Sequence, residues 1–432
     1  MRPAVGNTQA PQIIVSQIGR REHYAIPLAL HRAGMLAHFF TDGYVGKGSR
    51  LYPFAGTLPE FCRRGFLADI LTRTSNLPAD KVSAFNLLGF LYTWKLLKCK
   101  TQEGANEIYL WCAKQFNRQI LKNPKALLKG EAFYALSGVS LELFQFAKSH
   151  GQQCIVNQID PSLYEERLLA EESALWPDWE SEPATVQEDE LFARESEEWR
   201  LADLIIINSA FTQHALIELG APADKIRIVP LAVDCQRFHP LPRRRTSDRV
   251  HFLFVGTVGL RKGIQYALQA LRLIKNPNIQ FTIVGRADFK FKSKKATEYS
   301  DKITYIGHVP GGEVMSTYQQ ADVYIFPTIS DGFGLTQLEA MACGLPVITT
   351  PNCGSVVRDG VDGFIVPIRD SDALAEKMEI LARDRELLAW MSRNARERAL
   401  EFSWENYQER LVNAVSSCWL PDKAAAEGHG GC

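Results

Sequence analysis

The sequence predicts an α/β protein of two domains that share a cleft. At 432 residues the chain is longer than one typical domain, which favours two. Apolar runs that end in a glycine and pass into a helical pattern occur in both halves, at Gln12–Met35, Val250–Leu271 and Asp322–Gly344. Units of strand, loop and helix are typical of parallel sheets covered by helices.

The first domain is predicted at residues 1–240. It opens with a strand at Gln12–Gly19, a helix at Arg20–Met35 and a second strand at Ala37–Asp42. Gly19 lies at the end of the first strand, where a backbone without a Cβ allows a ligand or the other domain to come close.

A helical insertion into this domain is predicted at about 57–122. It carries aromatic and basic side chains together, in Phe85, Phe90, Tyr92, Trp94, Lys95, Lys98 and Lys100. Two interpretations are open. The slightly favoured one is a packed insertion whose lysines face water, and the other is a surface that touches a membrane.

The rest of the first domain returns to the α/β pattern. Gln152–Pro161 and Leu204–Ser209 are predicted strands, and Ser209 is placed to cap the next helix. Between them, 162–200 is acidic and helical, a composition that usually forms a solvated face. Residues 241–249 combine proline and charge with little apolar content, which is typical of a linker.

The second domain is predicted at 250–401 and begins with a strand and a glycine loop. The loop lacks the Gly-x-Gly-x-x-Gly spacing of nicotinamide dehydrogenases. Arg261 and Lys262 lie where it meets the following helix. Two adjacent cations at this place would neutralise a diphosphate and stabilise its charge as it leaves.

The stretch Asp322–Thr350 is the most informative in the chain. A buried strand is followed by the polar loop Ser330–Gly334, by a helix with apolar residues on one face, and by another strand. The helix would point its N-terminal N–H groups at an anion, and two carboxylates, Asp331 and Glu339, frame the loop. Carboxylates there accept hydrogen bonds from vicinal hydroxyls, so a nucleotide sugar fits the site.

The sequence DGFGLTQLEAMACGLPV resembles the motif of the family 4 retaining glycosyltransferases, glycosyl transferases group 1. That motif has two acidic residues separated by seven others around a Gly-Phe-Gly-Leu loop, and Asp331 stands where the family usually has glutamate. The resemblance is close over 201–417. It implies the GT-B fold, in which two Rossmann-like doubly wound domains face a central cleft. It also implies a helix at 402–418 that crosses back to the first domain, before a tail at 421–432 predicted to be disordered.

The resemblance also implies residue roles. Glu339 would hold the ribose hydroxyls, Asp331 the sugar, and Arg261 with Lys262 the diphosphate. The other donor-binding positions that it implies are Gly19, Arg286, His308, Val309, Gly332, Phe333, Gly334 and Leu335. The reaction would transfer a sugar from a nucleoside diphosphate sugar to an acceptor hydroxyl with retention. No Asp-x-Asp motif is positioned at a strand end, so we expect the two cations and the helix dipole to suffice without a metal or other cofactor.

Composition limits the partners and the compartment. Lys plus Arg and Asp plus Glu number 49 each, so no overall field attracts nucleic acid. Nine scattered cysteines without Cys-x-x-Cys spacing favour a reducing cytoplasm and no zinc site. The N-terminus lacks an apolar signal core, and no run has the length of a membrane span. We expect a cytoplasmic protein, with peripheral attachment to the membrane left open.

Several alternatives remain at this stage. The acceptor is a glycan, a lipid-linked molecule or a small molecule, and the sequence does not select the donor base or sugar. A non-catalytic nucleotide-sugar-binding protein on the same fold is a second candidate, because Asp331 departs from the family pattern. A nucleotide-sugar epimerase or hydrolase is a third, and it would consume donor without an acceptor.

Overall fold

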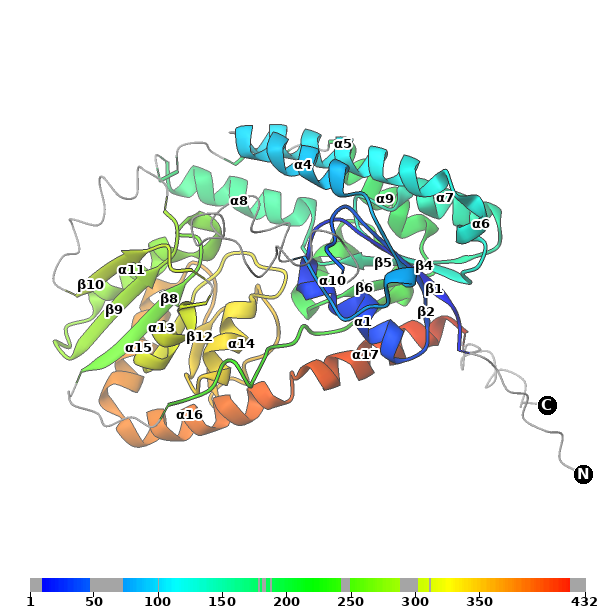
Figure 1. The fold of residues 1–432 in the computed structure, drawn as a ribbon. Coiled ribbons are helices and arrows are strands. Elements are labelled where there is room, and N and C mark those ends of the chain that lie inside the picture. Colours follow the sequence, from blue (N-terminus) through cyan, green and yellow to red (C-terminus); the bar gives the residue numbers. More distant parts are fainter. Residues whose placement is uncertain are drawn as a thin grey trace, which may run out of the picture.

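The computed structural model describes residues 10–46, 73–99, 101–177, 179–180, 184–186, 189–241, 249–287, 302–310 and 312–419. In this part of the chain two parallel β-sheets lie beside each other, and helices cover both faces of each (Figure 1). The predicted α/β class is confirmed. Most of the predicted linker at 241–249, residues 57–72 of the predicted insertion and the predicted tail at 421–432 lie outside the described residues.

The first sheet has seven parallel strands in the order β3-β2-β1-β4-β5-β6-β7. The strands are β1 (Ile13–Gln17), β2 (Leu36–Thr41), β3 (Val82–Ala84), β4 (Ala132–Leu136), β5 (Gln153–Gln158), β6 (Leu204–Ile207) and β7 (Ile226–Ile228). β1 is buried along its whole length, as expected for a strand with helices on both faces. The strand order reverses between β1 and β4, and ligands bind at the carboxyl ends of strands at such a point.

Helices pack on this sheet through two apolar clusters. The helices are α1 (Ala25–Arg32), α4 (Asn86–Lys98), α5 (Gln102–Leu121), α6 (Pro124–Leu127), α7 (Leu141–Ser149), α9 (Glu190–Leu201) and α10 (Ala210–Glu218). Ser209 caps α10 as predicted, since its hydroxyl accepts a hydrogen bond from Thr212 N at 3.0 Å.

The second sheet has six parallel strands in the order β10-β9-β8-β11-β12-β13. The strands are β8 (Val250–Val255), β9 (Ile279–Val284), β10 (Ile303–Gly307), β11 (Val323–Phe326), β12 (Val347–Thr349) and β13 (Gly363–Ile365). The helices of this domain are α11 (Ile264–Leu273), α13 (Val314–Gln320), α14 (Leu335–Ala342), α15 (Ser371–Arg383) and α16 (Arg385–Leu400), and α17 (Trp404–Ser416) follows them in the chain. The strand order reverses between β8 and β11.

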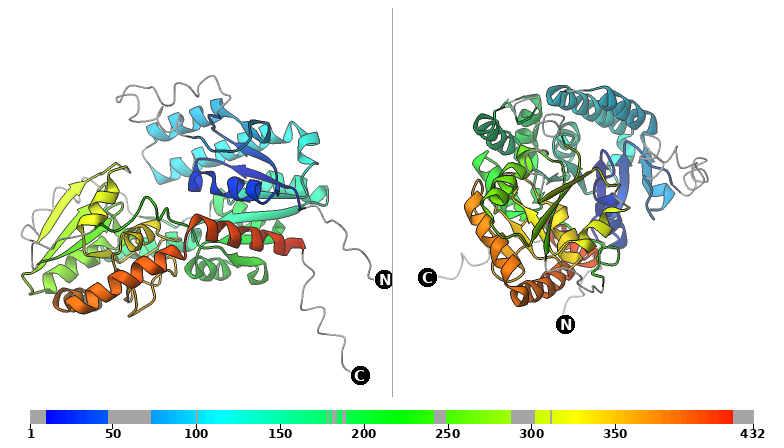
Figure 2. Two further views of the ribbon diagram at one scale, coloured as in Figure 1. Left: turned by 60° about the horizontal axis from the view of Figure 1, so that its bottom comes forward. Right: turned by 90° about the vertical axis from the view of Figure 1, so that its left-hand side faces the viewer.

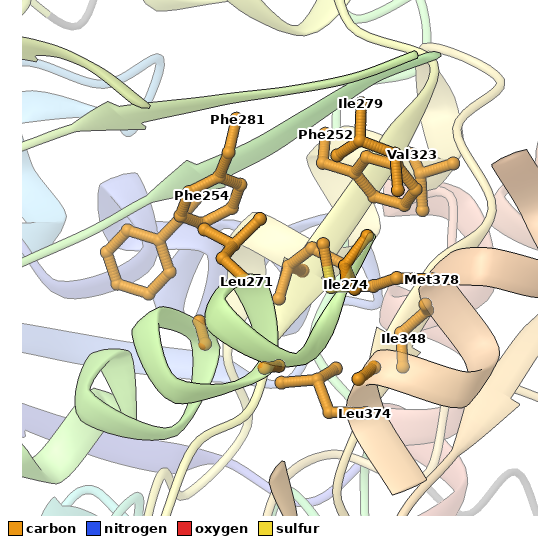
Figure 3. Close-up of a cluster of buried hydrophobic side chains, with 14 of the residues drawn as sticks. Phe252, Phe254, Leu271, Ile274, Ile279, Phe281, Val323, Ile348, Leu374 and Met378 are labelled. Atoms are coloured by element: carbon orange, nitrogen blue, oxygen red, sulfur yellow. The ribbon is translucent and has the colours of Figure 1, made fainter. Parts of the chain in front are cut away.

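In the core of the second domain, side chains of the strands pack against side chains of the helices. Figure 3 shows Phe252, Phe254 and Phe281 of the sheet against Leu271 of α11 and Met378 of α15. Each of these side chains is almost fully buried. Burial of a side chain of this size contributes about 1.5–3 kcal/mol, so this layer fixes the sheet on which the loops of the site are mounted.

The helix predicted at Arg20–Met35 begins later than predicted. Glu22, His23 and Tyr24 have φ values of 49°, 52° and 62°, and α1 starts only at Ala25. Tertiary contacts hold this unusual turn: Tyr24 Oη donates to Gly43 O at 2.6 Å, and the Glu22 carboxylate accepts from Tyr407 Oη at 2.7 Å. The sequence carries no local signal for these partners.

The insertion predicted as helical also contains a strand. β3 pairs with β2 through Val82, Ser83 and Ala84 and forms the edge of the first sheet. Three residues are too few for a period-2 pattern to stand out in a sequence. The helical prediction holds for the described residues that form α4 and α5.

The two domains exchange segments. Helix α8 (Leu163–Leu175) comes from the first half of the chain, yet Trp179 just beyond it belongs to the apolar core of the second domain. Helix α17 follows the second domain and packs on the first-domain cluster, through Tyr407, Leu411 and Val415. Figures 1 and 2 show α8 and α17 running between the domains. The domains are therefore tied at two places besides the residues that join them in sequence.

Candidate active site

The site is built where the strand order of the second sheet reverses. The loops that follow β8 and β11 meet there, because these two strands are neighbours. Arg261 O accepts hydrogen bonds from Ile329 N at 2.9 Å and from Thr328 Oγ1 at 3.0 Å. The cation-bearing loop and the Gly-Phe-Gly loop are thus joined through their backbones.

Gly263 permits this close approach. Its φ is +67°, and a Cβ at this position would overlap with the carbonyl oxygen of Pro327. Gly263 also lies between η5 (Leu260–Lys262) and α11, so its left-handed turn orients both cations before the helix starts. Only glycine fits this position, because the backbone has a positive φ and because the Pro327 carbonyl leaves no room for a Cβ.

A Gly263→Ala variant is expected to unfold at a lower temperature than a Gly360→Ala variant. Both substitutions impose a positive φ on alanine, which costs about 1–2 kcal/mol. Only Gly263→Ala also forces the two loops apart, because a Cβ on Gly360 would meet open space. Melting curves of the two variants test this, and equal melting temperatures would show that the loops tolerate separation.

Arg261, Lys262 and Asp331 form a charged group at the meeting point. The Lys262 ammonium is ion-paired with Asp331 Oδ2, and Arg261 Nη1 lies 3.9 Å from the same oxygen. Only 13% of the Lys262 side chain and 15% of that of Asp331 are exposed. Burial lowers the pKa of Lys262. Burial opposes ionisation of Asp331 as well, but the charges of Lys262 and Arg261 outweigh it and its pKa is lowered.

Asp331 also shapes the glycine loop. Its Oδ1 accepts a hydrogen bond from Phe333 N at 3.1 Å, and its own N–H donates to Asn352 O at 3.0 Å. A carboxylate with these partners holds the loop conformation in addition to balancing the cations. The shorter aspartate side chain is long enough for this pairing.

Glu339 lies on α14, separate from the ion pair. Tyr318 Oη donates a hydrogen bond to Glu339 Oε2 at 2.8 Å, and burial raises the pKa of this carboxyl. Glu339 and Leu335 line a cavity of about 530 Å³ that also reaches His23 of the first domain. Glu339 is therefore oriented by a buried tyrosine and faces open space between the domains.

Three predicted donor-binding residues lie at the carboxyl ends of β9 and β10. Arg286 and His308 are exposed, and Val309 is partly buried against the core that contains Phe326. Gly285 N donates to Gly307 O at 2.8 Å, which joins the two loops. These two loops lie at the same edge of the sheet as the loop that carries Lys262, because all six strands are parallel.

The glycine loop, whose residues are predicted to bind the donor, packs against other parts of the protein. A Cβ on Gly332 would overlap with the carbonyl oxygen of Ile159, in the first domain, and Gly332 O accepts from Thr212 Oγ1 at 3.3 Å. A Cβ on Gly334 would overlap with the Phe326 ring, and the Phe333 side chain is buried. In this conformation the small residues allow tight packing between and within domains.

Gly19 lies at the corresponding reversal point of the first sheet. Its φ is +77°, a Cβ there would meet no other atom, and its N–H donates to Asp42 Oδ1 at 2.7 Å. Asp42 is fully buried and forms a 2.8 Å ion pair with Arg73. Arg21 nearby lines a second cavity of about 530 Å³, on the first-domain side of Arg261.

Glu165 is a residue of this second cavity that sequence reasoning missed. Its Oε2 accepts from Ser330 Oγ at 2.7 Å and lies 3.7 Å from Arg261 Nη1, so it connects the first half of the chain to both loops of the site. Burial raises its pKa. The signal in the sequence was the acidic run itself, which was interpreted as a solvated face.

That interpretation of 162–200 is wrong for several glutamates. Glu172 is fully buried, accepts from Gln265 Nε2 at 3.0 Å and from Tyr266 Oη at 2.9 Å, and pairs with Arg369. Glu198 accepts from the N–H groups of Gly138, Ser140 and Leu141 at 2.6–2.9 Å. These carboxylates are buried because they bind groups from distant parts of the chain, which composition cannot reveal.

The buried glutamates on α9 predict a pH dependence of stability. Burial raises the pKa of Glu195 above its ordinary 4.5, and burial also raises the pKa of Glu198 to about 7. The folded protein therefore holds protons that the unfolded chain releases, so stability falls as the pH rises from about 4.5 to 7 and beyond. A Glu195→Gln variant, which resembles the protonated acid, should show a smaller fall in melting temperature over this range.

The matched control is Glu103→Gln, at an exposed position of α5. It should follow the wild-type dependence. A Glu195→Gln curve that is parallel to the wild type would show that Glu195 is ionised in the folded protein throughout this range.

Among the described residues, no group of three His, Cys, Asp or Glu side chains is arranged to hold a metal ion. The seven cysteines in this part of the chain form no disulfide with one another. None of the helices in the described ranges has the length and apolar composition needed to cross a bilayer.

Comparison with known proteins finds a family model that matches the second domain. The family model of the glycosyl transferases group 1 matches residues 241–398, which contain Arg261, Lys262, Asp331 and Glu339. Residues 241–398 are thus similar to the glycosyl transferases group 1. The predicted resemblance to this group is thereby confirmed for the second domain.

Curated relatives are similar over part of their length. The amylovoran biosynthesis glycosyltransferase AmsK of Erwinia amylovora is 27% identical over 186 residues, which are 40% of this chain and 46% of that protein. The D-inositol 3-phosphate glycosyltransferase of Paenarthrobacter aurescens (strain TC1) is 31% identical over 255 residues, or 53% of this chain and 62% of that protein. The matches thus span about half of each relative.

The solved structure of HepE from Anabaena, in complex with UDP, shows that the likeness of fold covers both domains. It is 16% identical, and the alignment covers 94% of this chain and all of that chain with a TM-score of 0.60. At this identity the comparison concerns the fold. The predicted GT-B fold of two Rossmann-like domains is confirmed.

Proposed function

We propose that the protein is a retaining glycosyltransferase that moves a sugar from a nucleoside diphosphate sugar to an acceptor hydroxyl. The observation that carries the proposal is the meeting of Arg261 and Lys262 with Asp331 at the reversal point of a domain similar to the glycosyl transferases group 1. The names of the curated relatives, which are glycosyltransferases, support it. Retention is the outcome that the resemblance to family 4 implies.

Donor binding requires the ion pair to change partners. Lys262 is committed to Asp331 in this conformation, and a diphosphate would offer it oxygens of higher negative charge. Asp331 would then be released to accept hydrogen bonds from sugar hydroxyls, while Arg261 keeps both loops together. Because Lys262 is largely buried, its charge acts on the leaving diphosphate with little screening by water.

Glu339 fits the ribose role in this proposal. Vicinal hydroxyls can both donate to one carboxylate, and Tyr318 holds Glu339 toward the cavity between the domains. The base would lie along the exposed loops of Arg286 and His308. The acceptor would enter the cavity of Arg261 and Glu165, which is lined by several carboxylates that can accept hydrogen bonds from hydroxyls.

The test is a thermal-shift and turnover screen with UDP-, GDP- and ADP-sugars, each with and without EDTA. One donor that raises the melting temperature and is slowly hydrolysed would support a transferase, and the NMR coupling of the product's anomeric proton would test retention. Donor consumption with no dependence on any acceptor would favour an epimerase or hydrolase. No shift with any nucleotide would favour a non-catalytic protein, and loss of turnover in EDTA would contradict a metal-independent reaction.

A further inference from the structure

Helix α4 has one strongly exposed apolar face. Its members are spaced three or four residues apart, so they project from one side of the helix: Leu87, Phe90, Leu91, Trp94 and Leu97. Leu87 is 74% exposed, Leu97 69% and Trp94 45%. We call these five residues the α4 surface. Contiguous exposed apolar residues of this kind mark interaction sites, and Figures 1 and 2 both place α4 on the outside of the first domain.

The opposite side of α4 is fixed to the domain. Leu88 is buried, and a Cβ on Gly89 would overlap with the carbonyl oxygen of Asp42, at the end of β2. Tyr92 and Leu96 line the cavity that contains Arg261. The helix therefore cannot rotate to bury its apolar face without losing these contacts, and the same helix borders both the α4 surface and the cavity.

The charge of the α4 segment itself favours an anionic partner. The segment 82–101 contains Lys95, Lys98 and Lys100 and no acidic residue. Lys98 Nζ lies 3.8 Å from the centre of the Trp94 ring, so a positive charge adjoins the apolar face. Apolar side chains with lysine and tryptophan at their edge match the boundary between acyl chains and anionic headgroups. A second copy of the chain would bring like charges together on this face.

We propose that the α4 surface docks on a lipid bilayer with anionic headgroups, and that the cavity behind α4 receives an acceptor carried on a lipid. The docking stands by itself on the exposed face and its charge. The acceptor class rests on the proposed function, because it assumes that this cavity is the acceptor site. Docking would leave only α4 between the membrane and the cavity that Tyr92 and Leu96 line, and so would shorten the path of such an acceptor to Arg261.

Flotation of the full-length protein with vesicles tests the docking without any donor or acceptor. Vesicles of phosphatidylcholine and phosphatidylglycerol in a ratio of about two to one should bind the wild type at least about tenfold better than phosphatidylcholine alone. Trp94→Glu should lower the bound fraction at least about tenfold. The matched control is Trp390→Glu on α16, where the tryptophan is 41% exposed, and it should bind as the wild type does.

Two further measurements distinguish insertion into lipid from self-association of the protein. Trp94→Phe keeps the face apolar, so it should still float but lose most of the quenching of tryptophan fluorescence by brominated lipids. Light scattering should show the same molar mass for the wild type and Trp94→Glu. Failure of the wild type to float, equal flotation of both glutamate variants, or a dimer that Trp94→Glu dissociates would each overturn the docking.

The acceptor class is tested with one sugar in two forms, free and attached to an alkyl chain in the vesicles. The alkyl form should be used at least about tenfold faster, and Trp94→Glu should lose this preference while its rate on the free sugar stays unchanged. Equal rates on both forms would overturn the lipid-borne acceptor and leave the docking intact. Absence of turnover with every donor would refute the proposed function, while flotation would still decide the docking.

Discussion

A Lys262→Met variant is expected to transfer sugar with a kcat/KM at least about 100-fold below the wild type, the usual effect of removing one donor that stabilises charge in a transition state. The substitution keeps most of the length and the apolar stem of the side chain, and removes the charge. In the wild type this ammonium lies 5.2 Å from the centre of the Phe326 ring. Steady-state rates with the donor found by the screen measure the effect.

The ion pair makes a control necessary, because Lys262→Met leaves the largely buried Asp331 without its main partner. Breaking such a pair destabilises a protein by about 3–5 kcal/mol. The double variant Lys262→Met with Asp331→Asn removes both charges and should regain stability but not activity. Lys275→Met, at an exposed position of the same domain, should resemble the wild type. Recovery of normal turnover in the double variant would mean that Lys262 serves only to balance Asp331.

A Glu339→Gln variant is expected to raise the KM for the donor by about 10–100-fold, with a smaller change in kcat. Hydrogen bonds to a charged group contribute about 1.5–3 kcal/mol, and an amide replaces the carboxylate that would accept both ribose hydroxyls. The expected effect is on binding, because the ribose is remote from the bond that breaks. Calorimetric titration with the nucleoside diphosphate alone measures this change in affinity directly.

A Tyr318→Phe variant tests how much the orientation of Glu339 contributes, apart from its own contact with the nucleotide. It keeps the ring in the core but removes the 2.8 Å hydrogen bond to Glu339 Oε2, so its effect on nucleotide affinity should be smaller and in the same direction. Unchanged affinity in Glu339→Gln would remove Glu339 from the nucleotide site. The ribose would then have to be held by other residues along the carboxyl edge of the second sheet.

Both predictions concern residues that were found in the sequence, and local pattern explains why. Arg261 with Lys262 and the Asp331–Glu339 motif lie within short strand, loop and helix units, whose geometry follows from buried strands and from glycines at fixed places. Parallel strands bring these loops to one edge of the sheet, and this could be predicted without knowing any contact between distant residues. The α/β class and the GT-B fold followed from the same local units and from the family motif.

Other features depended on contacts between residues far apart in the chain. Glu165, Glu172 and Glu198 belong to an acidic stretch that resembles a solvated face, yet each has partners that only folding brings near. The left-handed turn at Glu22–Tyr24 is held by Gly43 and Tyr407 and therefore shortened the predicted helix. Gly332 packs against Ile159, so its small size serves the domain contact in this conformation.

The sequence by itself predicted the fold class, the similarity of the second domain to the glycosyl transferases group 1 and the four charged residues of the candidate donor site, because these depend on periodicity and on spacing within about 30 residues. Tertiary structure alone decided that Lys262 pairs with Asp331, that α8 and α17 are exchanged between the domains, and that the apolar face of α4 is exposed. The physical reason is that burial of a charge or an apolar face depends on which distant groups satisfy it, and one segment does not carry that information.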